Sequence, residues 1–337
     1  MLGEDLKKFH EQVKDDEATN NFYERVHNQE CTFYAFAKGK EAKLKIPIVY
    51  FVEKINKANK ETGLIVMEDL SDRGFVRHIY DHAELPLLKD LAAALARLQA
   101  VSLKDPSWQQ NPELNKTIFE LTATSTTDKV TPELMEQGKQ MNVTQMKQRP
   151  QYYTEAIIGK FEKSIKSSMK EATDEYADMA TAHKRLGIPD VLCHGDFHIS
   201  NIFLKKDEKG DERLAAIFDW QLCHAGAPVE DFGHFLSMSV DGPTRRAHTM
   251  EVLQHYYDTL QEEMGDEPAP FTLDQVIENY KQIFKLGVIT WATSAPLDVP
   301  FEKAASKERA KENLLKNAVC LWEELIDLED HGNVPWN

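Results

Sequence analysis

Glycine is sparse in this chain of 337 residues, and its spacing excludes two common phosphate-binding motifs. Only Gly3 and Gly39 precede Gly63 among the 15 glycines, and no two glycines have the spacing of G-x-G-x-x-G or G-x-x-x-x-G-K. These motifs use glycine so that backbone amides can approach a phosphate closely. The sequence therefore predicts no glycine-rich turn over the phosphates of a nucleotide.

Paired cysteines, a secretory leader and long apolar runs are also missing. The four cysteines show no paired spacing: Cys31, Cys193, Cys223 and Cys320. The first residues combine no basic stretch with an apolar core, and the longest apolar segments are interrupted by charged residues. We therefore expect a reduced, cytoplasmic protein that has no membrane partner.

Basic residues are outnumbered by acidic residues, 40 to 56, which gives a formal net charge of −16. This excess argues against nucleic acid or an anionic membrane as a partner and mildly favours cationic ligands, although it can equally serve solubility alone. With 42% apolar residues, the chain is long enough to bury a full core in one large or two moderate domains.

The stretch from residue 194 to 219 concentrates polar groups at one end of a predicted hairpin. It contains, in order, a polar loop, an apolar run, a charged turn and a second apolar run: 194–201, 202–204, 205–212 and 214–218. Antiparallel strands bring the chain back to its starting point, so Asn201 and Asp219 should emerge together beside Asp196. Two carboxylates and one carboxamide form an oxygen-rich site suited to Mg²⁺, with one carboxylate left to orient a hydroxyl nucleophile.

The order His-x-Asp-x-x-x-x-Asn, followed by Asp after the next hairpin, is that of a kinase catalytic loop and its metal ligand. His194-Gly195-Asp196 resembles the form found in aminoglycoside phosphotransferases and choline kinases. With Asp219-Trp220-Gln221 added, the chain is most similar to the choline-kinase-like and ecdysteroid-kinase-like family of invertebrates. The resemblance implies ATP and Mg²⁺ as cofactors and a small-molecule alcohol as acceptor. It also implies that Asp196 orients the hydroxyl or accepts its proton, that His194 braces the loop, and that Asn201 and Asp219 hold Mg²⁺.

A literal Asp231-Phe232-Gly233 follows, but we do not interpret it as the kinase metal triplet. No strand precedes Asp231, and Phe232, Phe235 and Leu236 continue at helical spacing. In the kinases that this chain resembles, an Asp at this place supports the catalytic loop from a helix. Asp231 is assigned that supporting role.

Two further segments match parts of a kinase-like nucleotide site. Residues 4–38 are predicted to be helical, and Glu30 falls on the apolar stripe, where an unpaired carboxylate is costly. By resemblance, Glu30 would pair with a strand lysine, although a side chain at the edge of the stripe could also reach solvent. Residues 46–52 and 64–67 predict a second hairpin around a polar loop, 53–63. By the same resemblance, the backbone of Glu68, Asp69 and Leu70 would bind adenine.

The remaining segments are predicted to be helical scaffold. Amphipathic patterns occur at 84–101, around Tyr153, Ile157, Phe161 and Ile165, and in three stripes after residue 250. The expected fold is a protein-kinase-like, two-lobe α+β fold. A truncated small lobe would cover residues 1–70, with a hinge at 68–71, and a mainly helical large lobe would cover residues 72–337.

Two alternatives remain open at this point. The chain could be a pseudokinase that binds a nucleotide or a protein partner without turnover, because the glycine-rich turn and strand lysine are missing. It could also be a metal hydrolase using His194, Asp196 and His198. That alternative is weaker, since Gly195 disfavours a helix that would align the two histidines and no third ligand is positioned.

Overall fold

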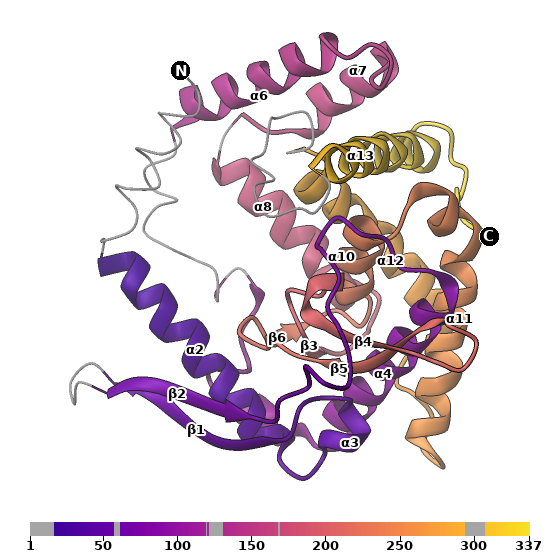
Figure 1. The fold of residues 1–337 in the computed structure, drawn as a ribbon. Helices are drawn as coiled ribbons and strands as arrows, with labels where there is room; N and C mark the ends of the chain where they lie inside the picture. The colour runs from indigo at the N-terminus through magenta and orange to yellow at the C-terminus, as the bar shows by residue number, and fades with distance from the viewer. Residues whose placement is uncertain (1–16, 57–60, 119, 121–130, 168, 294–306) are drawn as a thin grey trace.

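The computed structural model describes residues 17–56, 61–118, 120, 131–167, 169–293 and 307–337. The first elements are two helices and a pair of strands: α2 (Glu17–Ala37), α3 (Glu41–Leu44), β1 (Val49–Asn56) and β2 (Glu61–Met67). Figure 1 shows β1 and β2 lying along α2 at one end of the molecule. Part of the helix expected over 4–38 lies before residue 17, outside the described residues, and the rest is α2.

The middle of the chain is mainly helical, with short strands on either side of the polar loop 194–201. In order, it contains α4 (Leu85–Lys104), the 3-10 turn η2 (Pro106–Gln110), α6 (Pro132–Lys147), α7 (Glu155–Ser164), α8 (Met169–Ala180), α9 (Ala182–Arg185), β3 (Val191–Cys193), the 3-10 turn η4 (Ile199–Asn201), β4 (Ile202–Lys206), β5 (Glu212–Ile217) and β6 (His224–Gly226). The chain then continues as α10 (Glu230–Ser239), α11 (Gly242–Met264), α12 (Leu273–Gly287), the π-helical turn η5 (Val288–Ala292) and α13 (Lys307–Glu329).

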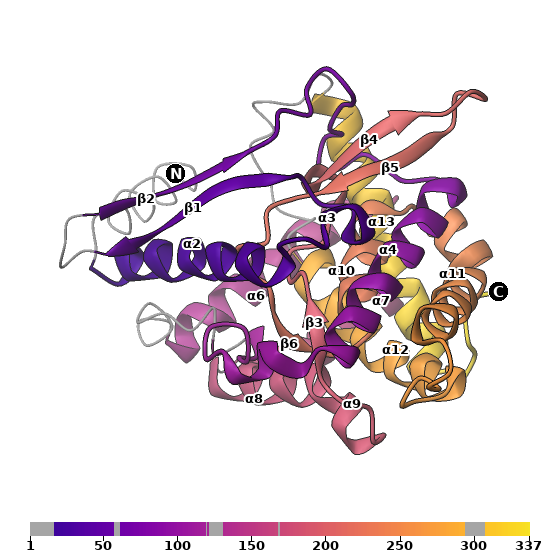
Figure 2. The same cartoon turned by 90° about the horizontal axis from the view of Figure 1, so that it is seen from below.

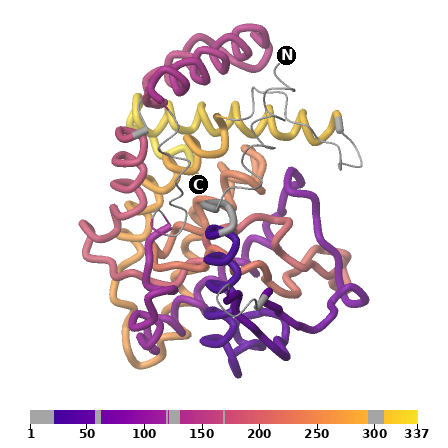
Figure 3. The backbone as a smooth tube through the Cα atoms, turned by 90° about the vertical axis from the view of Figure 1, so that its left-hand side faces the viewer, coloured from indigo at the N-terminus to yellow at the C-terminus, as the bar shows by residue number. Residues whose placement is uncertain are grey.

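The strands of the described residues form three antiparallel pairs, β1–β2, β3–β6 and β4–β5, and helices make up most of the remainder. This arrangement confirms the mainly helical α+β class and the kinase-like order of hairpin, loop and helices expected from the sequence. Figure 2 shows the β4–β5 hairpin above α4 and α11, which pack against each other. Seen from the side in Figure 3, the N-terminal strands lie at one end, with α6 and α13 at the other.

The helices begin and end where local chemistry favours it. Thr272 and Gln275 form a complete capping box at the start of α12, which satisfies two backbone donors that the first turn would otherwise leave unpaired. In α4, Pro86 lies in the first turn and a leucine stripe is buried against the rest of the molecule. No helix in the described part of the chain is long and apolar enough to cross a membrane.

A single buried cluster runs through the molecule and joins the N-terminal helix to the catalytic region. Phe33 of α2 stacks on Trp220, with ring centroids 3.9 Å apart and an interplanar angle of 11°. Both side chains are almost completely buried. The position of α2 is thus coupled to the residue that follows Asp219. The boundary between lobes at 68–71 stays a prediction.

Several expected boundaries were wrong. The β1–β2 hairpin, expected over 46–67, begins at Val49. Its pairing continues through Asn56 opposite Glu61, well into the expected loop. Residues 53–56 were assigned to the loop because three of the four are polar, yet backbone pairing does not require apolar side chains. Tyr153 and Ile165 flank α7 instead of lying within it.

Candidate active site

The polar loop 194–201 leads into β4, and its last residues lie at the open end of the β4–β5 hairpin. Ile202 pairs with Ile217, and the N–H of Phe218 donates to the carbonyl oxygen of Asn201 at 3.2 Å. Asn201 and Asp219 therefore leave the two strands at the same end. The antiparallel register, in which Ile202 pairs with Ile217, fixes this juxtaposition.

Asp219 has a left-handed backbone conformation, with φ of +67°. Asp is among the few residues other than glycine that adopt this region, which costs on the order of 1–2 kcal/mol. Such strain persists only where the surroundings hold it, and it is concentrated at functional sites. Here the carbonyl of the preceding residue, Phe218, accepts a hydrogen bond from His194, which holds the strained turn in place.

His194 is completely buried, and both of its ring nitrogens have partners in the backbone. Nε2 donates to the carbonyl of Phe218 at 2.9 Å, and Nδ1 accepts the N–H of Asp196 at 3.2 Å. Burial lowers the pKa of His194 to about 4, so the ring is neutral at physiological pH. With neither nitrogen available to a metal, the geometry does not support the hydrolase alternative.

Asp196 holds the side chain of Asn201 in place. Its Nδ2 donates to the backbone oxygen of Asp196 at 2.9 Å and to Oδ2 at 3.2 Å. Both bonds are made through the amide nitrogen. Oδ1 therefore remains as the atom through which this buried side chain could bind a cation.

Asp196 is part-buried beside two histidines. Its Oδ1 lies 3.4 Å from Nε2 of His198 and 3.9 Å from Nε2 of His234. Burial raises the pKa of Asp196, but the hydrogen bond from His198 and the field of His198, His234 and His194 outweigh it and lower the pKa to about 2. The carboxylate is therefore ionised at any pH at which the protein would work.

Glu30 of α2 lies against the turn that carries Asp219. Its Oε1 accepts the N–H of Trp220 at 3.2 Å. Burial, with a smaller contribution from the negative charge of Asp219, raises the pKa of Glu30 to about 7, although the hydrogen bond from the backbone N–H of Trp220 partly opposes this shift. Burial followed by the charge of Asp196 also raises the pKa of Asp219. Three carboxylates thus gather at a site where they repel one another.

Asp231 lies near the start of α10 and faces the catalytic loop. Oδ2 accepts the N–H of His194 at 2.8 Å, and Oδ1 accepts the N–H of Gly195 at 3.0 Å. Its location in a helix explains why the Asp-Phe-Gly sequence is not a metal triplet. Burial raises the pKa of Asp231 to about 6, while the two backbone donors favour its charged form.

The predicted hinge carries two side chains that hold its own backbone. Glu68 accepts the N–H of Ile48 at 3.0 Å and pairs with Arg73 at 2.6 Å, while Asp69 caps the turn that follows. The amide of Glu68 donates to the carbonyl of Ile48. Within the described residues, the amide of Leu70 and both backbone groups of Asp69 make no hydrogen bond. These groups remain available to a ligand.

Sequence reasoning did not identify His234, a neighbour of Asp196, or Trp291, which contacts His234. His234 is largely buried, its Nε2 makes no hydrogen bond among the described residues, and its ring lies 4.6 Å from that of Trp291. Trp291 belongs to the π-helical turn η5, a type of turn often found at functional sites. The signal for His234 was its position one helical turn after Asp231, which places both residues on one face of α10.

The comparisons with known proteins give one family and several distant relatives. The chain is 27% identical over 270 residues to Uncharacterized oxidoreductase dhs-27 of Caenorhabditis elegans, which is 76% of this chain and 30% of that protein. It is 33% identical over 118 residues to Uncharacterized kinase-like protein D1044.1 of the same organism, which is 34% of this chain and 30% of that protein. The match thus spans less than a third of the length of either relative.

One solved structure and one family model complete the comparison. The structure of Plasmodium vivax ethanolamine kinase Pv091845 superposes with a TM-score of 0.44 and 14% identity over 86% of this chain and 72% of that one. A family model described as DUF1679, Uncharacterized oxidoreductase dhs-27, matches residues 1–332. The chain therefore belongs to the DUF1679 family.

Proposed function

We propose that the chain is an ATP- and Mg²⁺-dependent phosphotransferase whose acceptor is the alcohol group of a small molecule. The observation that carries the proposal is the gathering of Asp196, Asn201 and Asp219 at the open end of the β4–β5 hairpin. The similarity to a kinase-like protein over 118 residues supports it. Membership in the narrower choline-kinase-like and ecdysteroid-kinase-like group belongs to the same proposal.

The donor set fits Mg²⁺ for an electrostatic reason. Burial, followed by the negative charge of Asp196, raises the pKa of Asp219, so the two carboxylates repel each other. The amide of Asn201 keeps its oxygen as the remaining ligand atom, and Mg²⁺ prefers carboxylate and amide oxygens. A cation held by Asn201 and Asp219 would relieve this repulsion. When bound, Mg²⁺ would neutralise charge that develops on the transferring phosphoryl group.

Asp196 would orient the acceptor hydroxyl and take its proton late in the reaction. A carboxylate whose pKa is about 2 is a weak base, so it gains little from early proton abstraction. Phosphoryl transfer passes through a loose transition state that depends mainly on positioning and charge stabilisation. His194 and Asp231 hold the loop that positions Asp196, through backbone hydrogen bonds at 2.8–3.2 Å.

The N-terminal part would supply the nucleotide contacts. The amide of Leu70 and the backbone of Asp69 offer a donor and an acceptor of the kind that adenine needs, and Glu68 stiffens the segment. Glu30 would stand beside the metal site and maintain the turn at Trp220. The four thiols are free, which agrees with the cytoplasmic location that we include in the proposal.

A nucleotide-binding pseudokinase is the second candidate, and one observation favours it. The side chain of Glu30 lies near Tyr34 and accepts the N–H of Trp220. Among the described residues, Glu30 forms no ion pair with a lysine, and the nearby Lys54 pairs with Glu113 instead. Loss of a lysine that acts on the phosphates would reduce turnover more than binding.

The family description names an oxidoreductase, but the residues of this chain give no support to nicotinamide chemistry. No G-x-G-x-x-G occurs, and the paired strands of the described regions are antiparallel rather than parallel. The relative bearing that name is matched over 30% of its length. A phosphotransferase therefore remains the better proposal for this part of the chain.

The test is calorimetric titration of ATP into the chain with and without Mg²⁺, followed by transfer of labelled γ-phosphate to a panel of small alcohols. Asp219→Asn suits the test because Asn tolerates the left-handed backbone conformation. We expect Mg²⁺-dependent binding that Asp219→Asn abolishes and Asp266→Asn, on the exposed surface, leaves intact. No nucleotide binding at millimolar Mg²⁺ would refute both candidates, while binding without transfer to any alcohol would favour the pseudokinase.

A further inference from the structure

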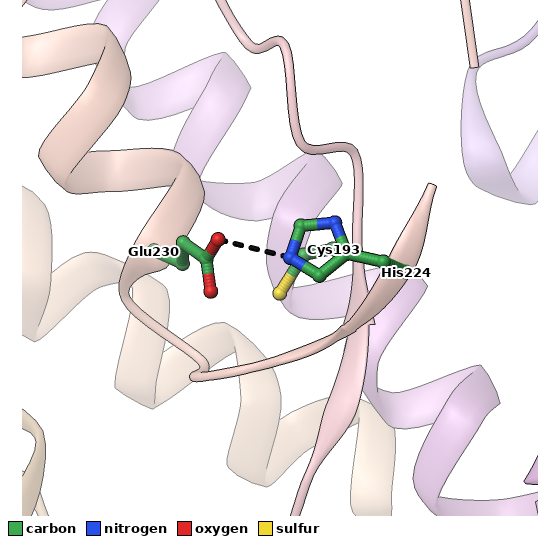
Figure 4. A group of neighbouring side chains, drawn as sticks. All are labelled: Cys193, His224 and Glu230. Atoms are coloured by element: carbon green, nitrogen blue, oxygen red, sulfur yellow. Dashed lines mark hydrogen bonds and ion pairs between the residues drawn. The ribbon is translucent and has the colours of Figure 1, made fainter. Parts of the chain in front are cut away.

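Cys193, His224 and Glu230 form a compact group beneath the catalytic loop, and the function proposed above does not use it. They come from β3, from β6 and from the first turn of α10, and Figure 4 shows the three side chains converging on one another. One potential ligand atom from each residue lies within 4.8 Å of the other two. Cys193 and His224 are fully buried. The group therefore unites a thiol, an imidazole and a carboxylate away from solvent.

All three ligand atoms converge on Gly226. A Cβ placed on Gly226 would lie 3.0 Å from Sγ of Cys193 and 3.1 Å from Nε2 of His224, and closer still to Oε2 of Glu230. Gly226 has no left-handed backbone conformation that would require glycine. The ligand atoms instead converge so closely on Gly226 that a side chain there would push at least one of them away.

The hydrogen bonds of His224 aim one nitrogen at this space. Nδ1 lies 2.8 Å from the carbonyl oxygen of Leu222, so it carries a proton and donates it there. Nε2 lies 2.9 Å from Oε1 of Glu230. A lone pair on Nε2 cannot face a carboxylate without a positive charge between them. Either a proton or a metal ion must therefore occupy this contact.

We propose that Cys193, His224 and Glu230 bind a transition-metal ion, with Zn²⁺ as the best match. Thiolate, imidazole and carboxylate are all common Zn²⁺ ligands, whereas Mg²⁺ and Ca²⁺ avoid sulfur. The backbone carbonyl that fixes Nδ1 of His224 is the usual outer partner of a metal-bound histidine. The Ala227 carbonyl oxygen, 3.2 Å from Sγ, or a water molecule could complete a tetrahedral site.

The required movement is small. Zn²⁺–ligand distances of about 2.0–2.3 Å in a tetrahedral arrangement place ligand atoms roughly 3.3–3.7 Å apart. The contact between His224 and Glu230 would therefore widen by less than about 1 Å. Binding breaks the S–H bond of Cys193, displaces the proton between His224 and Glu230, and forms bonds from sulfur, nitrogen and oxygen to the metal, so two protons pass to solvent.

The metal would link the elements that carry the catalytic loop. Cys193 directly precedes His194, and Glu230 directly precedes Asp231, whose carboxylate accepts the amides of His194 and Gly195. An ion bound at this point would fasten β3, β6 and α10 together behind the loop. Its role is structural, and it is separate from the Mg²⁺ site proposed at Asn201 and Asp219.

A bare proton is the competing occupant. It would make His224 an imidazolium paired with Glu230, and the thiol of Cys193 would donate only to the carbonyl oxygen of Ala227. The two occupants predict different behaviour towards chelators and different protonation of His224 in the purified chain.

The experiment measures zinc by mass spectrometry in the full chain purified without chelator, and then replaces it with Co²⁺ after chelation. We expect one equivalent of zinc, and a thiolate-to-cobalt charge-transfer band together with the visible bands of tetrahedral Co²⁺. Cys193→Ser should remove the charge-transfer band and weaken binding by more than the roughly 10–100-fold that loss of an outer partner costs. The control is Cys223→Ser, which alters an equally buried cysteine outside the group and should retain the band.

Two measurements keep the proposal testable if Cys193→Ser does not fold. Chelation of the unaltered chain should lower its Tm, and addition of Zn²⁺ should restore it. Gly226→Ala, which keeps the three ligand residues but forces their ligand atoms apart, should weaken this response. A chain with substoichiometric zinc, no thiolate–cobalt band and an NMR signature of doubly protonated His224 would overturn the proposal in favour of the ion pair.

Discussion

The carboxylate of Asp231 accepts the backbone N–H of His194 at 2.8 Å, across a separation of 37 residues in the sequence. Its second oxygen accepts the N–H of Gly195 at 3.0 Å. A buried helix side chain thus satisfies two consecutive amides of loop 194–201, and these amides form no other hydrogen bond within the described residues. The position of Asp196, one residue further on, depends on this support.

Asp231→Ala should act mainly on stability. The substitution leaves two buried amides without an acceptor, at roughly 1–3 kcal/mol for each. Urea unfolding followed by far-UV circular dichroism would measure the loss, and Asp266→Ala, which is exposed, serves as the control. A variant of unchanged stability that has lost transfer would instead show that Asp231 takes part in the chemistry.

Asp196→Asn should separate binding from transfer. The asparagine keeps an oxygen that can accept the hydrogen bond from Asn201, so the loop and Mg²⁺-dependent ATP binding should survive. Transfer to an alcohol should fall by about 10²–10⁴-fold, the usual contribution of a positioned acid or base. ATP affinity from calorimetry and initial rates of transfer would be compared on the same preparation. Equal loss of both quantities would mean that Asp196 holds the metal.

The sequence predicted the parts of the site that depend on local periodicity. Two short apolar runs, 202–204 and 214–218, around a charged turn were sufficient to predict that Asn201 and Asp219 leave a hairpin at the same end. Helical spacing after Asp231 correctly removed the Asp-Phe-Gly sequence from the list of metal ligands. Both inferences needed only neighbours within a few residues.

What could not be predicted depends on tertiary packing. His234 and Trp291 meet beside Asp196 because α10 and η5 pack together, and neither residue lies in a motif. Glu30 was placed correctly on the buried face of its helix, but its contact is the amide of Trp220, not a strand lysine. No local pattern in the sequence predicts that Glu30 will accept the backbone N–H of a residue 190 positions away.

Glu30→Gln should stabilise the protein at neutral and alkaline pH. The pKa of Glu30 is raised from 4.5 to about 7, so ionisation is harder in the folded chain than in the unfolded chain. The unfolded chain therefore binds fewer protons between these values, and stability falls as pH rises from 4.5 through 7. Gln removes this dependence while still accepting the N–H of Trp220.

The gain for Glu30→Gln should be at most about 3 kcal/mol above pH 7 and should vanish near pH 4. Urea midpoints across this range, compared with those of the exposed Glu162→Gln, would measure it. A gain that is the same at every pH would show that the effect comes from packing and not from the charge of Glu30.

Gly195→Ala should be among the most damaging small substitutions in the loop. Gly195 has φ of +84°, and an added Cβ would lie 2.8 Å from Nδ1 of His224 and 3.0 Å from the carbonyl carbon of Leu222, with the carbonyl oxygen closer still. Because Leu222 contributes backbone atoms, the loop itself must move.

Gly187 isolates the steric part of this cost, since it has a similar φ of +75° with nothing within 4 Å of the added Cβ. Gly187→Ala should cost about 1–2 kcal/mol through backbone strain alone. Gly195→Ala should cost a further 1–3 kcal/mol, roughly that of overpacking, and should abolish transfer even where the chain remains folded, because Asp196 moves with the loop. Paired urea titrations and transfer assays would test this. Equal destabilisation by the two substitutions would mean that the loop yields without strain and that its close approach to Leu222 is not needed.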